Sequence, residues 1–194
     1  MKILPIYAIG HPVLREENRW IKQGEKGLNA LISAMFDTMY NAHGVGLAAP
    51  QVGQNVKIFI ADGTPMEGML ENDPTPMKGW KKVFINPLIV SESGEEWDFE
   101  EGCLSVPDIK TDIRRKAKIV LRYFDENFLE KEEEFAGMRA RIIQHEHDHL
   151  EGILFIDHVK GLRKQMLKSR LQKVSRGAIE LRYPMEFLKK KQPI

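Results

Sequence analysis

The sequence predicts a mixed fold in which three helices accompany several short strands. In three segments, apolar residues recur at intervals of three and four, which is typical of helices that bury one face. Elsewhere, short runs rich in Val, Ile, Phe and Tyr are typical of strands. The 194 residues fall within the usual size of a single domain, so we expect residues 1–194 to fold as one unit.

Composition restricts the class of protein. Apolar residues make up 42% of the chain and charged residues 29%, which is ordinary for a globular protein and excludes a mainly disordered chain. No apolar run approaches the roughly 18 residues that a membrane helix needs. The single cysteine, Cys103, cannot form an internal disulfide, and the N-terminal segment lacks a small-residue cleavage site. We therefore expect the protein to work in the cytoplasm.

In the first half of the chain, residues 28–40 predict a helix because their apolar side chains lie on one face. Residues 41–53 contain three glycines and a proline and predict irregular backbone. Residues 56–61 predict a strand. The many turn-forming residues of 62–82 predict a loop of about twenty residues, which is long between two elements of one domain.

In the second half, three short strands are expected, at residues 83–85, 88–90 and 118–123. A helix is predicted over 135–150, with the acidic residues 132–134 before or in its first turn, where the helix dipole favours negative charge. Gly152 suits its C-terminal cap. A last helix is predicted over 162–174, and the alternation of residues 178–183 predicts a short strand.

The strongest chemical signal lies in residues 144–149, Gln-His-Glu-His-Asp-His. On a helix His145 and His149 point the same way and can bind one metal ion, because residues four apart are about 40° apart around the axis. Glu146 lies beside them, where it can act as a general base. His147 is expected to face away. The two histidines also continue the apolar stripe of the predicted helix, which a merely solvated helix end would not explain.

A catalytic metal site usually has three protein ligands and one open position, so a third ligand is needed. The residue types that can supply it occur at several places. The candidates are Cys103, Asp148, Glu151, His158, His11 and His43. A lone intracellular cysteine is often only a small buried apolar residue, but Cys103 lies in a Gly-flanked, Pro-terminated segment with acidic neighbours.

A third segment, residues 44–51, combines glycines with a terminal amide. Gly44 and Gly46 allow a ligand to approach the backbone closely. The amide of Gln51 could donate hydrogen bonds to a developing oxyanion. The segment lacks the G-x-G-x-x-G spacing of a dinucleotide site.

Taken together, residues 44–51, 101–105 and 144–149 closely resemble the three motifs of the peptide deformylase family, in the family's order. The resemblance implies a metal-dependent hydrolase that removes the formyl group from the N-terminal formyl-methionine of newly made proteins. It also implies an α+β fold in which antiparallel strands pack around a central metal-binding helix, with a further helix near the C-terminus.

The resemblance assigns roles to individual residues. It implies that Cys103, His145 and His149 hold one divalent metal ion, which is Fe²⁺ in the family, although Zn²⁺, Ni²⁺ and Co²⁺ suit the same ligands. Glu146 is then the general base. Gln51 and the backbone N–H of Leu104 are expected to form the oxyanion hole.

Substrate recognition is expected from neighbouring positions. The resemblance implies that Gly46 helps to hold the substrate backbone. Methionine needs an apolar pocket, and our candidates for its lining are Val45, Met138 and Ile142. The last two lie two turns and one turn before His145 on its helix face. Each of the three could equally be an ordinary core residue.

The C-terminal region has an unusual charge. From residue 160 to 194 there are eleven basic residues and only two acidic ones, so this region carries +9 and the rest of the chain −8. We expect an anionic partner, and ribosomal RNA is the candidate because formylated chains leave the ribosome. Two alternatives are a zinc metallopeptidase that cuts internal peptide bonds and a non-catalytic nucleic-acid-binding module. The cysteine ligand speaks against the first, and the second leaves the histidine motif unexplained.

Overall fold

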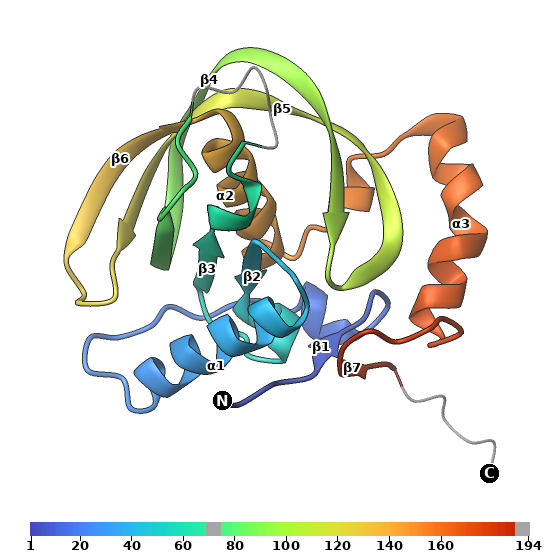
Figure 1. Cartoon of the computed structure of the whole chain (residues 1–194), viewed down its shortest axis with the longest axis horizontal. Coiled ribbons are helices and arrows are strands. Elements are labelled where there is room, and N and C mark those ends of the chain that lie inside the picture. Colours follow the sequence, from blue (N-terminus) through green and yellow to red (C-terminus); the bar gives the residue numbers. More distant parts are fainter. Residues whose placement is uncertain (69–74, 189–194) are drawn as a thin grey trace.

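The computed structural model describes residues 1–68 and 75–188, and its main element is a five-stranded antiparallel sheet (Figure 1). The strands are β1 (Ile6–Tyr7), β2 (Gly46–Ala48), β3 (Ile58–Asp62), β4 (Lys81–Cys103), β5 (Val106–Phe124), β6 (Glu130–Ala136) and β7 (Met185–Glu186). The order in the main sheet is β2-β3-β4-β5-β6, so every strand pairs with the next in the chain. A second, parallel sheet joins β1 to β7.

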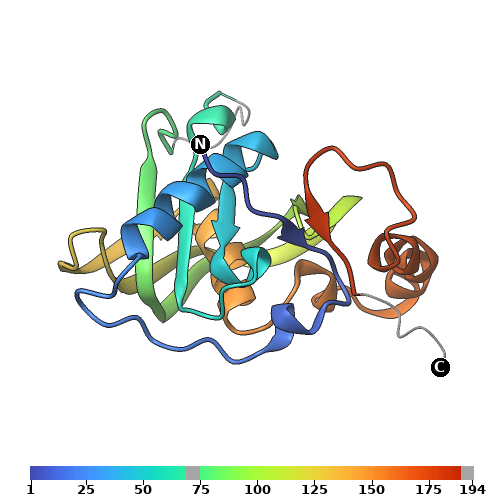
Figure 2. The same cartoon turned by 90° about the horizontal axis from the view of Figure 1, so that it is seen from below.

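The described residues form three α-helices, as predicted. They are α1 (Leu28–Asn41), α2 (Gly137–Leu150) and α3 (Gly161–Ser175). Helix α2 packs against the main sheet, and the long strands β4 and β5 curve over it (Figure 1). Helix α3 stands to one side of that sheet (Figure 2). None of these helices has the length and apolar character needed to cross a bilayer. The α+β fold class is confirmed.

Strands β4 and β5 are far longer than the sequence predicted. Residues 83–85 and 88–90 belong to one strand of 23 residues, and β5 begins twelve residues before the predicted 118–123. Much of the added length of β4 is exposed and charged, so apolar alternation is absent there. Opposite charges instead face each other across the strands, as in the Asp98–Arg114 ion pair of 2.6 Å. In β5, residues 109–114 do alternate between buried and exposed, a strand pattern that the prediction overlooked. Irregularities after Ile85, Ile89 and Ser93 bend the pair.

The acidic residues 132–134 come before the helix, which is one of the two placements predicted, and they take no part in its first turn. They lie in β6, and α2 starts at Gly137. The reason is cross-strand pairing: Glu132 contacts Arg122 of β5 at 2.9 Å. Two opposite-charge partners in the neighbouring strand, Arg122 and Lys118, outweigh the helix dipole here. Gly152 does follow the end of α2, with a φ of +69° that suits glycine.

Predictions for two loops and one short strand had mixed outcomes. Residues 41–53 are less irregular than expected, because they contain β2 and a 3₁₀ turn at Ala49–Val52. Within 62–82 the described residues form turns up to β4, with a 3₁₀ turn at Thr64–Met66, whereas residues 69–74 lie outside the described part. Residues 178–183 are not a strand. Pairing begins only at residues 185–186, which form β7, because their partner is the two-residue strand β1.

A cluster of buried aromatic rings fixes α2 against the sheet. Phe59 of β3 stacks on Phe84 of β4 with ring centroids 4.6 Å apart. Phe84 also contacts Tyr123 of β5 at 4.7 Å and Phe135 of β6 at 5.9 Å. Four adjacent strands therefore contribute to one apolar surface, on which the inner face of α2 packs.

Beside this apolar surface lies a buried cluster of charges. Glu101 of β4 accepts hydrogen bonds from two nitrogens of Arg115 of β5, at 2.8 and 3.0 Å. Arg141 of α2 donates to the same carboxylate at 2.7 Å. All three residues are less than 9% exposed. Because a buried charge is costly without partners, this cluster fixes the position of α2 relative to the long strands.

Glu101→Gln should lower the free energy of unfolding by about 3–5 kcal/mol, because two buried guanidinium groups lose their shared anion. The measurement is denaturant unfolding followed by circular dichroism. Glu100→Gln is the matched control, since Glu100 is the exposed neighbour on the same strand, and it should change stability by less than about 0.5 kcal/mol. Equal stability of the two variants would mean that the buried cluster contributes nothing to the fold.

Candidate active site

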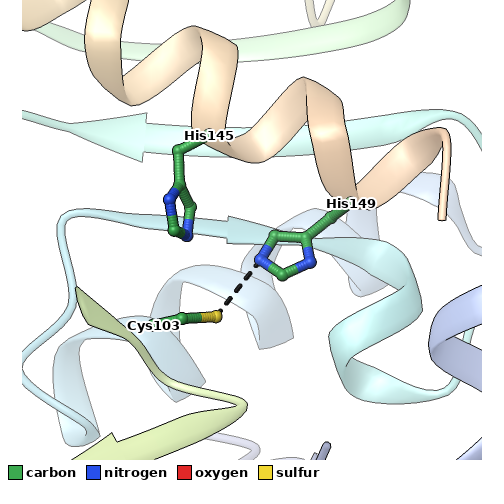
Figure 3. Close-up of side chains that lie close together, drawn as sticks. All are labelled: Cys103, His145 and His149. Atoms are coloured by element: carbon green, nitrogen blue, oxygen red, sulfur yellow. Dashed lines mark hydrogen bonds between the residues drawn. The ribbon is translucent and has the colours of Figure 1, made fainter. Parts of the chain in front are cut away.

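Two histidines of α2 project from the same side of the helix, one turn apart (Figure 3). The ring centroids of His145 and His149 are 5.2 Å apart. Met138 and Ile142, which precede them on the same stripe, are both buried in the apolar cluster behind the helix. The packing that buries this stripe therefore carries both imidazoles into the interior, as the sequence predicted.

Cys103 completes a cluster with these histidines (Figure 3). It is the last residue of β4, and its Sγ is 3.3 Å from Nε2 of His149. One ligand atom from each of the three side chains lies within 4.8 Å of the other two. Within residues 1–68 and 75–188 no other group of three His, Cys, Asp or Glu side chains comes together in this way.

The other candidates for a third ligand are placed elsewhere. The Asp148 carboxylate is 2.8 Å from His158 Nε2 and accepts a hydrogen bond from Arg115 at 2.8 Å. His11 accepts a hydrogen bond from the backbone at the start of its own 3₁₀ turn. Glu151 and His43 are exposed. Of the six residues that the sequence offered, the structure brings only Cys103 to the two histidines.

The buried Glu101 carboxylate also determines which nitrogen of His145 is free. Its Oε2 is 2.9 Å from His145 Nδ1. Burial by itself would raise the pKa of Glu101, but hydrogen bonds from His145 and Arg115 outweigh it and hold the pKa well below its usual range. An ionised carboxylate can only accept, so Nδ1 carries a hydrogen and Nε2 is the nitrogen left to bind a metal ion.

The donor set fits a divalent transition metal. One thiolate and two imidazoles are typical ligands for Zn²⁺, Fe²⁺ and similar ions. Burial opposes a charge on His145, yet the neighbouring Cys103 and Glu101 raise its pKa well above the ordinary value. Burial lowers the pKa of His149 well below its ordinary value, which keeps this imidazole neutral. The cluster therefore combines a neutral nitrogen donor with surroundings that stabilise one positive charge.

Glu146 lies on the flank of the histidines, against β2. Burial raises the pKa of its carboxyl group to about 7. Its Oε2 atom is buried and has no hydrogen-bond partner within the described residues. A Cβ atom at Gly46 would overlap this carboxyl group, so the glycine makes room for it. A carboxyl group with this pKa can both accept and release a proton near neutral pH.

The amide of Gln51 is fixed in orientation. Its Oε1 accepts the backbone N–H of Ala48 at 2.8 Å, so its NH₂ group points the other way. Nε2 lies 3.2 Å from Ser105 Oγ and 3.5 Å from Cys103 Sγ. Within the described residues the backbone N–H of Leu104 has no acceptor. Two hydrogen-bond donors therefore lie at or next to Cys103, and their role in binding an oxyanion stays a prediction.

The three predicted pocket residues gather in one place. Met138 and Ile142 belong to the apolar cluster behind α2, and Val45 packs against the same cluster at its partly buried margin. This arrangement suits both a methionine pocket and ordinary core packing. The pocket therefore stays a prediction.

Sequence reasoning missed the buried charge cluster. Glu101 was part of a recognised motif but received no role, although an acid two residues before a candidate ligand is a signal for a supporting partner. Arg115 and Arg141 carried no local signal. Their contacts depend on the pairing of β4 with β5 and on the docking of α2, which a linear pattern does not reveal.

Comparison with known proteins agrees with this geometry. The sequence model of the polypeptide deformylase family matches residues 3–165. A peptide deformylase from Christiangramia forsetii is 47% identical over 188 residues, covering 95% of this chain and 96% of the relative. One from Flavobacterium psychrophilum is 45% identical over 193 residues, covering 98% of this chain and all of the relative.

Solved structures show the same similarity. A plant peptide deformylase superposes with a TM-score of 0.79 at 33% identity, covering 90% of both chains. The enzyme from Legionella pneumophila gives 0.76 at 35% identity, covering 91% of this chain and 97% of that one. Together with the Cys-His-His cluster beside a buried glutamate, these matches show that the chain belongs to the polypeptide deformylase family.

Proposed function

We propose that this protein removes the formyl group from the N-terminal formyl-methionine of newly made chains, with residues 1–194 acting as one catalytic unit. The observation that carries the proposal is the cluster of Cys103, His145 and His149 with Glu146 at its side, in a member of this family. The three side chains are proposed to hold one divalent metal ion. Fe²⁺ is the ion that the family implies, and Zn²⁺, Ni²⁺ or Co²⁺ could replace it.

A divalent ion bound there supplies Lewis acidity, which acidifies a water molecule and polarises a carbonyl group. Glu146 is proposed to take the proton of the attacking water, since its carboxyl group is buried and its pKa lies near neutrality. The hydroxyl group adds to the formyl carbon, and the C–N bond then breaks. Glu146 returns its proton to the departing amine, and formate is released.

Two donors are proposed to stabilise the oxyanion that forms from the formyl oxygen. The first is Gln51 Nε2, which the hydrogen bond to Ala48 orients toward the site. The second is the backbone N–H of Leu104, which has no acceptor within the described residues. Preorganised donors of this kind are worth about 3–4 kcal/mol each in acyl-transfer enzymes, because no reorientation is needed during the reaction.

Substrate binding is proposed to use the surroundings of β2 and α2. Gly46 allows the substrate backbone to approach, and its missing side chain also leaves space for Glu146. Val45, Met138 and Ile142 are proposed to contact the methionine side chain, since they belong to one apolar cluster that borders the helix of the site.

The basic region from residue 160 onward is proposed to bind ribosomal RNA in the cytoplasm. Lys164, Lys168 and Lys173 of α3 are exposed. Leu167 and Val174 are buried against the body of the protein, whereas Met166, which was also expected to dock, is 71% exposed. The helix therefore presents cations outward, which suits contact with a polyanion. Basic residues at 189–191 lie outside the described part of the chain.

Glu146→Ala should retain its metal, because Glu146 is not a ligand, and should release formate from a formyl-methionyl peptide at least about a hundredfold more slowly than the wild type. The measurements are formate release and metal analysis of anaerobically purified protein. An unformylated peptide of the same sequence is the control substrate, and its cleavage by the wild type would favour the metallopeptidase alternative. Loss of metal together with activity would contradict the assignment of Glu146 as the base.

Cys103→Ser should bind metal much more weakly, since a neutral hydroxyl replaces a soft thiolate. Competition with a chromophoric chelator measures the change in affinity, and formate release should fall in parallel. Ser105 is a buried neighbour and provides a matched position: Ser105→Ala should keep the metal. If Cys103→Ser held one equivalent of metal at full activity, Cys103 would be only a structural residue.

Reversing the charges of Lys164, Lys168 and Lys173 should weaken ribosome binding at low salt and leave cleavage of a short formyl-peptide unchanged, because each lost phosphate contact reduces counterion release. Co-sedimentation with ribosomes over a salt series measures the effect. The control reverses three exposed lysines elsewhere, Lys2, Lys22 and Lys26. Equal ribosome affinity for both variants would leave α3 with no role in this contact.

A further inference from the structure

The turn that joins β4 to β5 carries one of the two proposed oxyanion donors. Leu104 and Ser105 form this turn, and the flanking residues Cys103 and Val106 pair with each other. One residue earlier the pairing is different, since Gly102 lies opposite Lys110. The regular ladder between the two long strands is therefore interrupted immediately before the turn.

The conformation of this turn is unusual for its length. Two-residue hairpin turns generally have a positive φ at one or both central positions, because such turns match the twist of the strands. Neither Leu104 nor Ser105 has a positive φ. In turns with a negative φ at the first position, the central peptide can reverse by rotation about ψ of that residue and φ of the next. The turn therefore depends on contacts from outside to hold its central peptide.

Those contacts come from the small sheet of β1 and β7. The Tyr183 hydroxyl, two residues before β7, donates to the Leu104 carbonyl oxygen at 2.8 Å. The backbone N–H of Ile9, two residues after β1, donates to the Ser105 carbonyl oxygen at 2.8 Å. The two strands lie side by side (Figure 2) and are joined by a hydrogen bond from Ile6 N–H to the Pro184 oxygen at 2.9 Å.

We propose that Tyr183 is a positioning residue for deformylation: its hydroxyl holds the Leu104 carbonyl and so restrains the backbone of Leu104, whose N–H is proposed to face the oxyanion. The carbonyl that Tyr183 holds and the N–H that is proposed to act in the reaction belong to the same residue. They lie on consecutive peptides that meet at the Leu104 Cα, so a displacement of this residue would shift the donor, and small misplacements of such groups are costly. The inference rests on the proposed function of this site.

The side chain of Tyr183 is held in place by packing against the core. The Tyr183 ring packs against the apolar cluster that also contains Ile6 and Leu47. Residues 177–186, which follow the basic helix α3, therefore connect the core to the Leu104–Ser105 turn. The sequence showed only that this region is basic and alternating, and it gave no sign of this contact.

Tyr183→Phe tests the proposal, since it removes one hydroxyl group and keeps the ring. The control is Tyr7→Phe on β1, whose hydroxyl has no hydrogen bond to the turn. Steady-state kinetics, metal analysis and hydrogen exchange of residues 103–106 are measured for both. Tyr183→Phe should lower kcat roughly fivefold, the size expected for one neutral hydrogen bond, with KM and metal content unchanged. Exchange at the turn should be faster than in the control.

Unchanged exchange and unchanged kcat in Tyr183→Phe would overturn the proposal. Loss of metal, or an equal loss of kcat in both variants, would also overturn it, because either result indicates a general structural role. Failure of the wild type to release formate would refute the proposed function instead. In that case the exchange comparison still reports whether the hydroxyl holds the turn.

Discussion

A single buried carboxylate determines how the parts of this site fit together. Glu101 of β4 contacts Arg115 of β5, Arg141 of α2 and His145 of α2. A charge with these surroundings is tolerated only when its partners are all in place. The contact thus sets the register between the two long strands and the axial position of the helix. It also chooses the tautomer of His145, so that one interaction links the packing of the fold to the chemistry of the ligand.

The side chains of the metal cluster come from regular elements, whereas the other groups of the site come from turns. The helix supplies two imidazoles and the proposed base at fixed spacing, and a strand end supplies the thiol. The proposed donors for the oxyanion come from a 3₁₀ turn and a two-residue turn, where backbone groups are not consumed by regular pairing. Turns offer free N–H groups, but they need support from neighbours, and here Gln51 and Ser105 provide part of it.

The parts that the sequence predicted correctly are those with a local signal. The spacing of His145 and His149 follows from helix geometry alone, and the apolar stripe before them predicted their burial. Cys103 could be chosen among six candidates only through the family resemblance. The length of β4 was missed because cross-strand ion pairs, such as Asp98 with Arg114, stabilise an exposed strand without apolar alternation. The position of β7 depends entirely on a partner at the other end of the sequence.

The pairing of β1 with β7 has a consequence for the order of folding. The helices and the main sheet consist of neighbours in the chain, since each strand of that sheet pairs with the next one. The two-residue parallel pair instead closes a loop that includes nearly all the described residues, and its few hydrogen bonds cannot offset that entropy until the intervening structure exists. The small sheet is therefore expected to form late in folding. The turn between β4 and β5, which this sheet contacts, is then expected to reach its final shape only after the rest of the molecule has folded.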